Sequence, residues 1–139
     1  MKSKLNIYSD GASRGNPGPS AVGFIALTED GRILKKFSKY VGTKTNNQAE
    51  YEALISALEF ASEKADQAVC HMDSELLVKQ MNGEYRVKDA KLRGLWLKAN
   101  QLTQCFSKIT FVHVPRTDPH IQMVDELANQ TLNTVHKNQ

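Results

Sequence analysis

The periodicity of the apolar residues changes once along the chain, and this change restricts the fold more than any other feature. In the first third the apolar runs are short and strand-like, and residues 4–10 place Leu5 and Ile7 on one face and polar residues on the other. Two further strand-like runs, SAVGFIALT and ILKKFSKYVG, flank the dipeptide Asp30-Gly31, which favours a hairpin turn. Between the first two runs, the segment GASRGNPGP holds three glycines and two prolines, so we expect no regular structure there. The first third is therefore predicted to be a meander of three strands.

After residue 46 the spacing becomes helical, with short buried strands in between. Apolar residues recur at intervals of three and four from Asn47 to about Glu63, which is the pattern of a helix with one buried face. The other elements that we expect are a strand at 68–73, a short helix at 74–81, a helix at 92–106, a strand at 108–114 and a helix at about 121–135. Trp96 falls on an apolar stripe, so we place it in the core rather than on a base-stacking surface. The order β-β-β-α-β-α-α-β-α predicts an α/β fold with a mixed sheet and helices on both faces.

Length and composition predict one compact domain spanning residues 1–139. The 139 residues, of which 40% are hydrophobic, suffice for a single core and not for two. No apolar run approaches the roughly 18 residues of a membrane span, and the N-terminal residues lack the apolar stretch of a secretion signal. Cys70 and Cys105 lie in apolar stretches without CxxC spacing, so we expect two buried free thiols rather than a disulfide. These features predict a cytoplasmic protein without a membrane partner, and a monomer by default.

The distribution of charge says more than the net charge of +3. The stretch from Arg32 to Lys44 holds five basic residues and no acidic one. The stretch from Lys79 to Lys98 holds six basic residues and two acidic ones. Each stretch is either an ordinary solvated face or a surface that follows the phosphates of a nucleic acid, and the charges alone leave both interpretations open.

Four carboxylates occupy positions that an active site would use. Asp10 and Asp73 each end an expected strand, and ligands collect beyond the carboxyl ends of parallel strands in such sheets. Glu50 and Asp125 are expected in the first turn, or close to it, of their helices, with Asp125 pointing obliquely toward the sheet. Carboxylate oxygens are the ligands that Mg²⁺ prefers, and two such ions roughly 3.5–4 Å apart can hydrolyse a phosphodiester.

Each of these acids also has a purely structural interpretation. Glu50 lies three residues after Asn47 and could close a capping box with it. Asp10 could start a turn before Gly11, and Asp73 could cap the next helix together with Ser74. Asp125 could simply favour the positive end of its helix. Spacing alone leaves the metal site and the structural interpretation open.

Four sequence segments carry a resemblance to a known family. They are SDGASRGNPGP after a strand, TNNQAEYEAL at the start of a helix, MDSELLVKQMNGEY, and VPR followed by VDELANQTL. Together, in this order and spacing, they resemble type 1 ribonuclease H over essentially the whole chain. The resemblance implies a five-stranded mixed sheet in the order 3-2-1-4-5 with strand 2 antiparallel. It also implies Mg²⁺- or Mn²⁺-dependent hydrolysis of the RNA strand of RNA–DNA hybrids, which leaves 5′-phosphate and 3′-hydroxyl ends.

The resemblance also implies roles for individual residues. Asp10 would bridge two metal ions, Glu50 and Asp73 would complete their ligands, and Asp125 would hold the second ion. The residues that it implies for substrate binding are Gly11, Asn16, Thr45, Asn47 and Gln48. Among these, the asparagines and Gln48 would contact the minor groove and the 2′-hydroxyl groups of RNA, and Thr45 a DNA phosphate. The alternative for these polar residues is capping of the loop and helix.

The sequence departs from the family pattern in several places. The segment after VPR is about two residues longer than in short members, and Ile121 stands where an asparagine is common. His120 could be the loop histidine that some members use, or an ordinary surface histidine. Residues 79–98 are shorter than the basic protrusion of some relatives, and we expect no additional hybrid-binding domain. Two other functions stay open: a catalytically inert nucleic-acid-binding module, and a nuclease that also cleaves double-stranded RNA.

Overall fold

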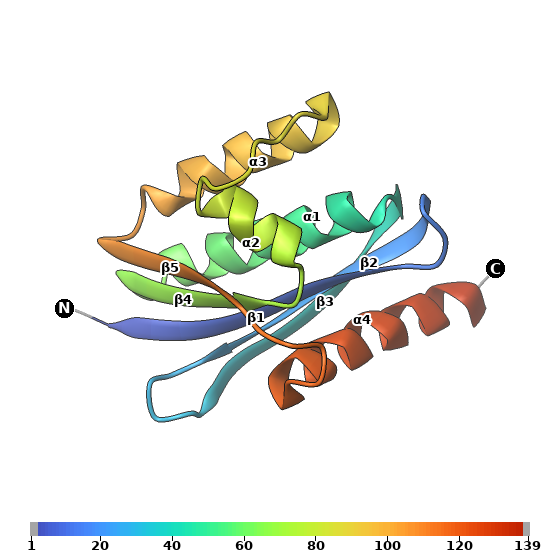
Figure 1. Cartoon of the computed structure of the whole chain (residues 1–139). Helices are drawn as coiled ribbons and strands as arrows, with labels where there is room; N and C mark the ends of the chain where they lie inside the picture. Colours follow the sequence, from blue (N-terminus) through green and yellow to red (C-terminus); the bar gives the residue numbers. More distant parts are fainter. Residues whose placement is uncertain (1–2, 138–139) are drawn as a thin grey trace.

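A five-stranded mixed sheet runs through the middle of the molecule (Figure 1). The structure is a computed structural model, and it describes residues 3–137. The strands are β1 (Lys4–Ser13), β2 (Gly18–Leu27), β3 (Ile33–Lys44), β4 (Gln67–Met72) and β5 (Lys108–His113). Their order is β3-β2-β1-β4-β5; β2 is antiparallel to β1 and β3, whereas β1, β4 and β5 are parallel. This order and these directions confirm the predicted sheet.

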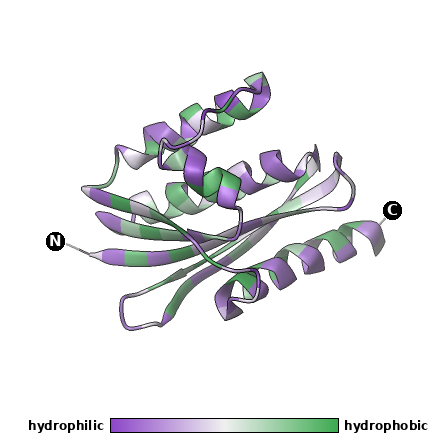
Figure 2. Cartoon of the chain, viewed as in Figure 1, coloured by the Kyte–Doolittle hydropathy of each residue, from purple (hydrophilic) through white to green (hydrophobic). Residues whose placement is uncertain are grey.

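The helices cover both faces of the sheet (Figure 1). They are α1 (Asn46–Ser62), α2 (Glu75–Met81), α3 (Ala90–Thr103) and α4 (Pro119–Lys137). The first three lie on one face, and α4 lies alone on the other. In Figure 2 hydrophobic and hydrophilic residues alternate along α1 and α4, which is typical of helices with one apolar and one polar face. None of the helices in residues 3–137 is long and apolar enough to cross a bilayer.

Alternation along β1 explains why the two faces have separate cores. Leu5 and Ile7 are buried under α1 in the larger core cluster. Tyr8 points to the opposite face and packs with Val124 of α4. Trp96 of α3 is partly buried and packs against the larger cluster, on the core side as expected. Because β1 has a helix against each face, side chains on alternate positions reach different layers of the molecule.

Four expectations about local structure are wrong. Strand pairing continues through Gly11–Ser13 and resumes at Gly18, so only residues 14–17 of GASRGNPGP lie outside strands. Helix α4 begins at Pro119 rather than at Ile121, because Asp118 Oδ1 accepts hydrogen bonds from the backbone N–H groups of His120 and Ile121. Helix α3 ends at Thr103, before Phe106. Cys105, just past that end, is exposed, whereas Cys70 on β4 is buried as expected.

Strand β3 forms one edge of the sheet, and its side chains are mostly exposed. Lys35, Lys36 and Lys39 project from this strand into solvent. In residues 3–137 no strand pairs with its outer edge. The basic stretch from Arg32 to Lys44 therefore lies mostly on an exposed edge of the sheet.

Candidate active site

Asp10 and Asp73 come together because β1 extends beyond the end of its parallel neighbour. Pairing between β1 and β4 ends at Tyr8 and His71, whereas pairing between β1 and β2 continues to Ser13. Asp10 therefore lies inside β1. The sequence had suggested that Asp10 ends the strand, and this expectation is wrong. Asp10 and Asp73 each lie two residues beyond the last parallel pair, Asp10 within β1 and Asp73 directly after the end of β4. Both lie where the parallel pairing stops, which is where ligands are expected in such sheets.

Glu50 reaches the same place because α1 lies unusually close to β1. A Cβ atom at Gly11 would overlap the backbone of Ala49 and Glu50, so only glycine permits this approach. The backbone N–H of Gly11 donates to Glu50 Oε1 at 2.5 Å. This hydrogen bond orients the Glu50 carboxylate toward Asp10.

The capping box of α1 does not involve Glu50, so the structural alternative considered for this residue does not apply. Thr45 is the N-cap, and its Oγ1 accepts from the backbone N–H of Gln48 at 3.1 Å. Gln48 Oε1 accepts in return from the backbone N–H of Thr45 at 2.9 Å. The proposed pairing of Asn47 with Glu50 is therefore wrong, because the box starts two residues earlier. Glu50 takes no part in the cap.

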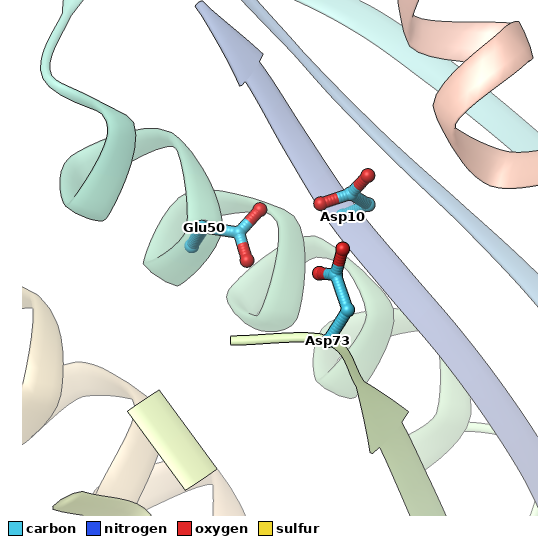
Figure 3. A group of neighbouring side chains, drawn as sticks. All are labelled: Asp10, Glu50 and Asp73. Atoms are coloured by element: carbon cyan, nitrogen blue, oxygen red, sulfur yellow. The ribbon is translucent and has the colours of Figure 1, made fainter. Parts of the chain in front are cut away.

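Asp10, Glu50 and Asp73 form a compact triad of carboxylates (Figure 3). One oxygen atom from each of them lies within 4.8 Å of the others. Among residues 3–137, no other group of three or more His, Cys, Asp or Glu side chains meets this criterion. Their oxygens point toward one another from β1, α1 and the end of β4 (Figure 3). An all-oxygen donor set of this kind fits a hard divalent cation such as Mg²⁺ or Mn²⁺.

The electrostatics of the triad also favour a cation. Burial raises the pKa of Asp10 to about 6; its hydrogen bond with Glu50 opposes this shift, and the charges of Asp73 and Asp125 add to it. Burial of the carboxylate and the charge of Asp10 raise the pKa of Glu50 well above its usual value. These carboxylates therefore resist ionisation together unless a positive charge lies between them.

Arg116 is a basic residue at this site to which sequence reasoning gave no role. Its Nε lies 3.4 Å from Asp73 Oδ2, although 92% of its side chain is exposed. The Asp73 side chain is only 7% exposed. Ser74, not Asp73, caps α2, because its Oγ accepts from the backbone N–H of Leu77. The only signal for Arg116 in the sequence was the segment VPR that precedes the last helix.

Asp125 faces the same cavity as the triad but does not belong to it. The cavity has a volume of about 630 Å³, and Arg116, Ile121 and Asp125 form one wall of it. Because α4 begins at Pro119, Asp125 lies in the second turn rather than the first, and it is exposed. Its negative charge nevertheless contributes to the raised pKa of Asp10. Its role as a fourth ligand stays a prediction.

The five predicted substrate-binding residues occupy three different places. Gly11 and Asn47 line the cavity. Asn16 lies beside the start of α1, where its Oδ1 accepts from the backbone N–H of Asn46 at 3.0 Å. Thr45 and Gln48 form the capping box, so the alternative of helix capping holds for this pair. Whether any of the five binds a substrate stays a prediction.

His120 lies in the first turn of α4 and not in a loop. Its ring contacts Tyr8, and it is not among the residues that line the cavity. Ile121, which follows it, is buried and contributes to the cavity wall. Both interpretations of His120, the loop histidine that some members use and an ordinary surface histidine of the loop, placed it in a loop, and this placement is wrong.

Comparisons with known proteins agree with this geometry. A protein family described as "Reverse transcriptase-like" matches residues 8–131. "Ribonuclease HI" of Halobacterium salinarum is 42% identical over 130 residues, which cover 93% of this chain and 64% of the relative. "Ribonuclease H" of Prosthecochloris aestuarii is 41% identical, and the match covers 95% of this chain and 97% of the relative.

A solved structure is similar over nearly the whole chain. LC11-RNase H1, isolated from compost and crystallised in complex with an RNA/DNA hybrid, superposes with a TM-score of 0.88 at 39% sequence identity. The match covers 94% of this chain and 98% of that one. Several relatives are longer than this chain. The chain spans 64% of the Halobacterium protein and 35% of each of three mycobacterial proteins.

Proposed function

The chain belongs to the ribonuclease H family, and from this premise we propose that it hydrolyses the RNA strand of RNA–DNA hybrids. The observation that carries the proposal is the triad of Asp10, Glu50 and Asp73, whose oxygens lie within 4.8 Å of one another. The hybrid bound to the similar LC11-RNase H1 supports the choice of substrate. Hydrolysis adds water across the bond between phosphorus and O3′, and leaves a 5′-phosphate and a 3′-hydroxyl.

The triad and Asp125 would hold two divalent cations, Mg²⁺ or Mn²⁺. Asp10 would ligate both, Glu50 and Asp73 would complete the set, and Asp125 would serve the second ion. The raised pKa values of Asp10 and Glu50 support this assignment, because a cation would offset the repulsion among carboxylates held together away from water. When bound, such a pair of ions activates water and stabilises the leaving oxygen.

The residues around the triad would keep its geometry and guide the substrate. The N–H of Gly11 holds Glu50 in one orientation. Arg116 lies beside Asp73 with its guanidinium in solvent, where it would attract the phosphate that is to be cleaved. The positive side chain of Arg116 is thus exposed to solvent, whereas the carboxylates of Asp10 and Asp73 are largely buried.

Recognition of the hybrid would use the start of α1 and the basic stretches. Gly11, Asn16, Asn47 and Gln48 would contact the minor groove, where the 2′-hydroxyl distinguishes RNA from DNA. Thr45 would hold a phosphate of the DNA strand. The lysines of β3 and the basic residues of 79–98 would follow the phosphates at longer range. We also propose that the domain acts as a monomer in the cytoplasm.

Cleavage of a hybrid that is labelled at the 5′ end of its RNA strand tests the proposal. We expect RNA products only with Mg²⁺ or Mn²⁺, none after chelation, and no cleavage of DNA–DNA duplexes. Metal-independent products, or a salt-sensitive complex without cleavage, would contradict the proposal and indicate an inert binding module. Equal rates on hybrid and RNA–RNA duplexes would contradict hybrid specificity while leaving the nuclease intact.

A further inference from the structure

Three rings from three different elements stack next to the carboxylates, and two of these rings lie two residues before Asp10 and Asp73. The Tyr8 ring of β1 lies parallel to the His71 ring of β4, with centroids 4.3 Å apart and planes at 11°. The His120 ring of α4 lies on Tyr8 at 4.6 Å and a tilt of 36°. These spacings are those of favourable aromatic contacts. We call these three residues the ring stack.

Each member of the ring stack is close in sequence to a residue that lines the cavity. Tyr8 precedes Asp10 by two residues on β1, and His71 precedes Asp73 by two residues beyond β4. His120 directly precedes Ile121, the first residue of α4 that lines the cavity. The ring stack therefore connects the two strands that carry the triad with the helix that carries Asp125.

The strand side of the ring stack is well fixed. His71 Nδ1 donates to the backbone carbonyl of Ile7 at 3.1 Å, which holds its ring flat against Tyr8. On the side of α4, fewer contacts hold His120. The backbone N–H of His120 donates to Asp118 Oδ1 within the same turn, and this hydrogen bond does not reach the sheet. The ring contact with Tyr8 is thus the link from His120 to the strands.

We propose that His120 is a positioning residue. Its ring, resting on Tyr8, sets the distance between the first turn of α4 and the sheet, and so places the cavity wall formed by Ile121, Gln122 and Asp125. The role needs a flat ring and not a titrating nitrogen, since His120 does not line the cavity. Its consequence for metal binding and cleavage rests on the proposed function, whereas its effect on the helix does not.

Two substitutions separate a positioning role from a chemical one. His120→Ala removes the ring, and His120→Phe keeps a flat ring without nitrogen atoms. His136→Ala is the matched control, because it makes the same change at an exposed position of the same helix. The three variants and the wild type are compared first by amide hydrogen exchange in α4, without metal or substrate.

In His120→Ala we expect exchange of the amides from Ile121 to Asp125 to rise about five- to tenfold, the range that the loss of one aromatic contact allows. His120→Phe should restore wild-type exchange, and His136→Ala should leave these amides unchanged. Unchanged exchange in His120→Ala would overturn the proposal. This measurement is independent of activity, so its failure is distinct from a failure to cleave hybrids.

The second measurement concerns the metal alone. Titration with Mn²⁺, followed by the electron paramagnetic resonance of the free ion, should show weaker binding in His120→Ala by about tenfold, as for other residues that orient metal ligands. The Mn²⁺ concentration for half-maximal cleavage should shift in parallel, and His120→Phe should restore both. If His120→Phe is as impaired in cleavage as His120→Ala while its exchange is normal, His120 acts through its nitrogen atoms and the proposal is wrong.

Discussion

The two sides of the cavity are built in different ways. The triad side is enclosed: Asp10 is 7% exposed, and α1 is held against Gly11 by a contact that admits no larger residue. The opposite wall is open, with Asp125 exposed and Arg116 almost wholly in solvent. Enclosing like charges costs stability, whereas a charge on the open wall costs little. The enclosed side therefore sets the geometry, whereas the two exposed side chains of the other wall, Arg116 and Asp125, can change without removing a buried charge.

Asp10→Asn is expected to give the largest effect. Cleavage should fall on the order of a thousandfold, because a neutral amide cannot replace a carboxylate ligand in metal-assisted hydrolysis. The metal-free variant should unfold at a higher temperature than the wild type at pH 7, since one of the repelling charges is gone. Hybrid cleavage and thermal unfolding in chelator measure the two effects. Glu59→Gln, at an exposed position of α1, serves as the control and should change neither.

Asp125→Asn tests the exposed wall of the cavity, where we expect an effect on cleavage but not on stability. We expect cleavage to fall by about a hundredfold at limiting Mg²⁺, and less at high Mg²⁺, if the exposed carboxylate serves only the second ion. The unfolding temperature should stay the same, because no buried charge is removed. Glu126→Gln, the exposed neighbour on α4, is the matched control. A drop in stability equal to that of a core substitution would erase the distinction between the two walls.

The pH dependence of stability should follow from the enclosed side alone. A carboxyl whose pKa is higher in the folded than in the unfolded chain binds more protons when folded. Asp10, with its pKa raised to about 6, should therefore contribute the most stability below pH 4 and lose that contribution as the pH rises through 6. The free energy of unfolding of the metal-free protein should fall by about 2 kcal/mol between pH 4 and pH 7 from this source.

Urea unfolding at a series of pH values in chelator measures this loss. Asp10→Asn should flatten the curve over that interval, and saturating Mg²⁺ should restore stability at pH 7, because a bound cation favours the ionised carboxylates. A wild-type curve that rises from pH 4 to pH 7 without metal would contradict the raised pKa of Asp10.

Thr45→Ala should have the smallest of these effects. Loss of the N-cap oxygen should lower the free energy of unfolding by about 1 kcal/mol. Asn47→Ala, two residues further along, should cost almost nothing, since Asn47 is exposed and is not the cap. Equal losses in the two variants would mean that the capping box does not hold the start of α1.

The sequence predicted the sheet order and the triad because strong local signals and family segments coincide there. It failed where a contact from outside the segment decides the structure. Gly11–Ser13 form strand because β2 pairs with them and α1 lies against Gly11, and neither neighbour is visible in GASRGNPGP itself. The glycines and prolines that predict a loop there permit a close approach instead.

The site shows the same limit. Asn47 and Glu50 have the spacing of a capping box, but Thr45 and Gln48 have it as well, and only the backbone decides between them. Arg116 lies beside Asp73 through a contact that spans 43 positions of the chain, which no periodicity reveals. The start of α4 was placed two residues too late, and Asp125 therefore too early in the helix, because the Asp118 cap lies in the segment that departs from the family pattern.

The exposed edge strand β3 has a consequence for how copies of this protein meet. A sheet edge with free backbone donors and acceptors invites a second edge to pair with it, which is the first step of aggregation. On β3, Lys35, Lys36 and Lys39 lie along that edge, and the edge of another copy would bring its own lysines against them. Repulsion between like charges then disfavours the pairing. The lysines that we propose to follow the phosphates of a hybrid would thus also oppose pairing between copies at this edge.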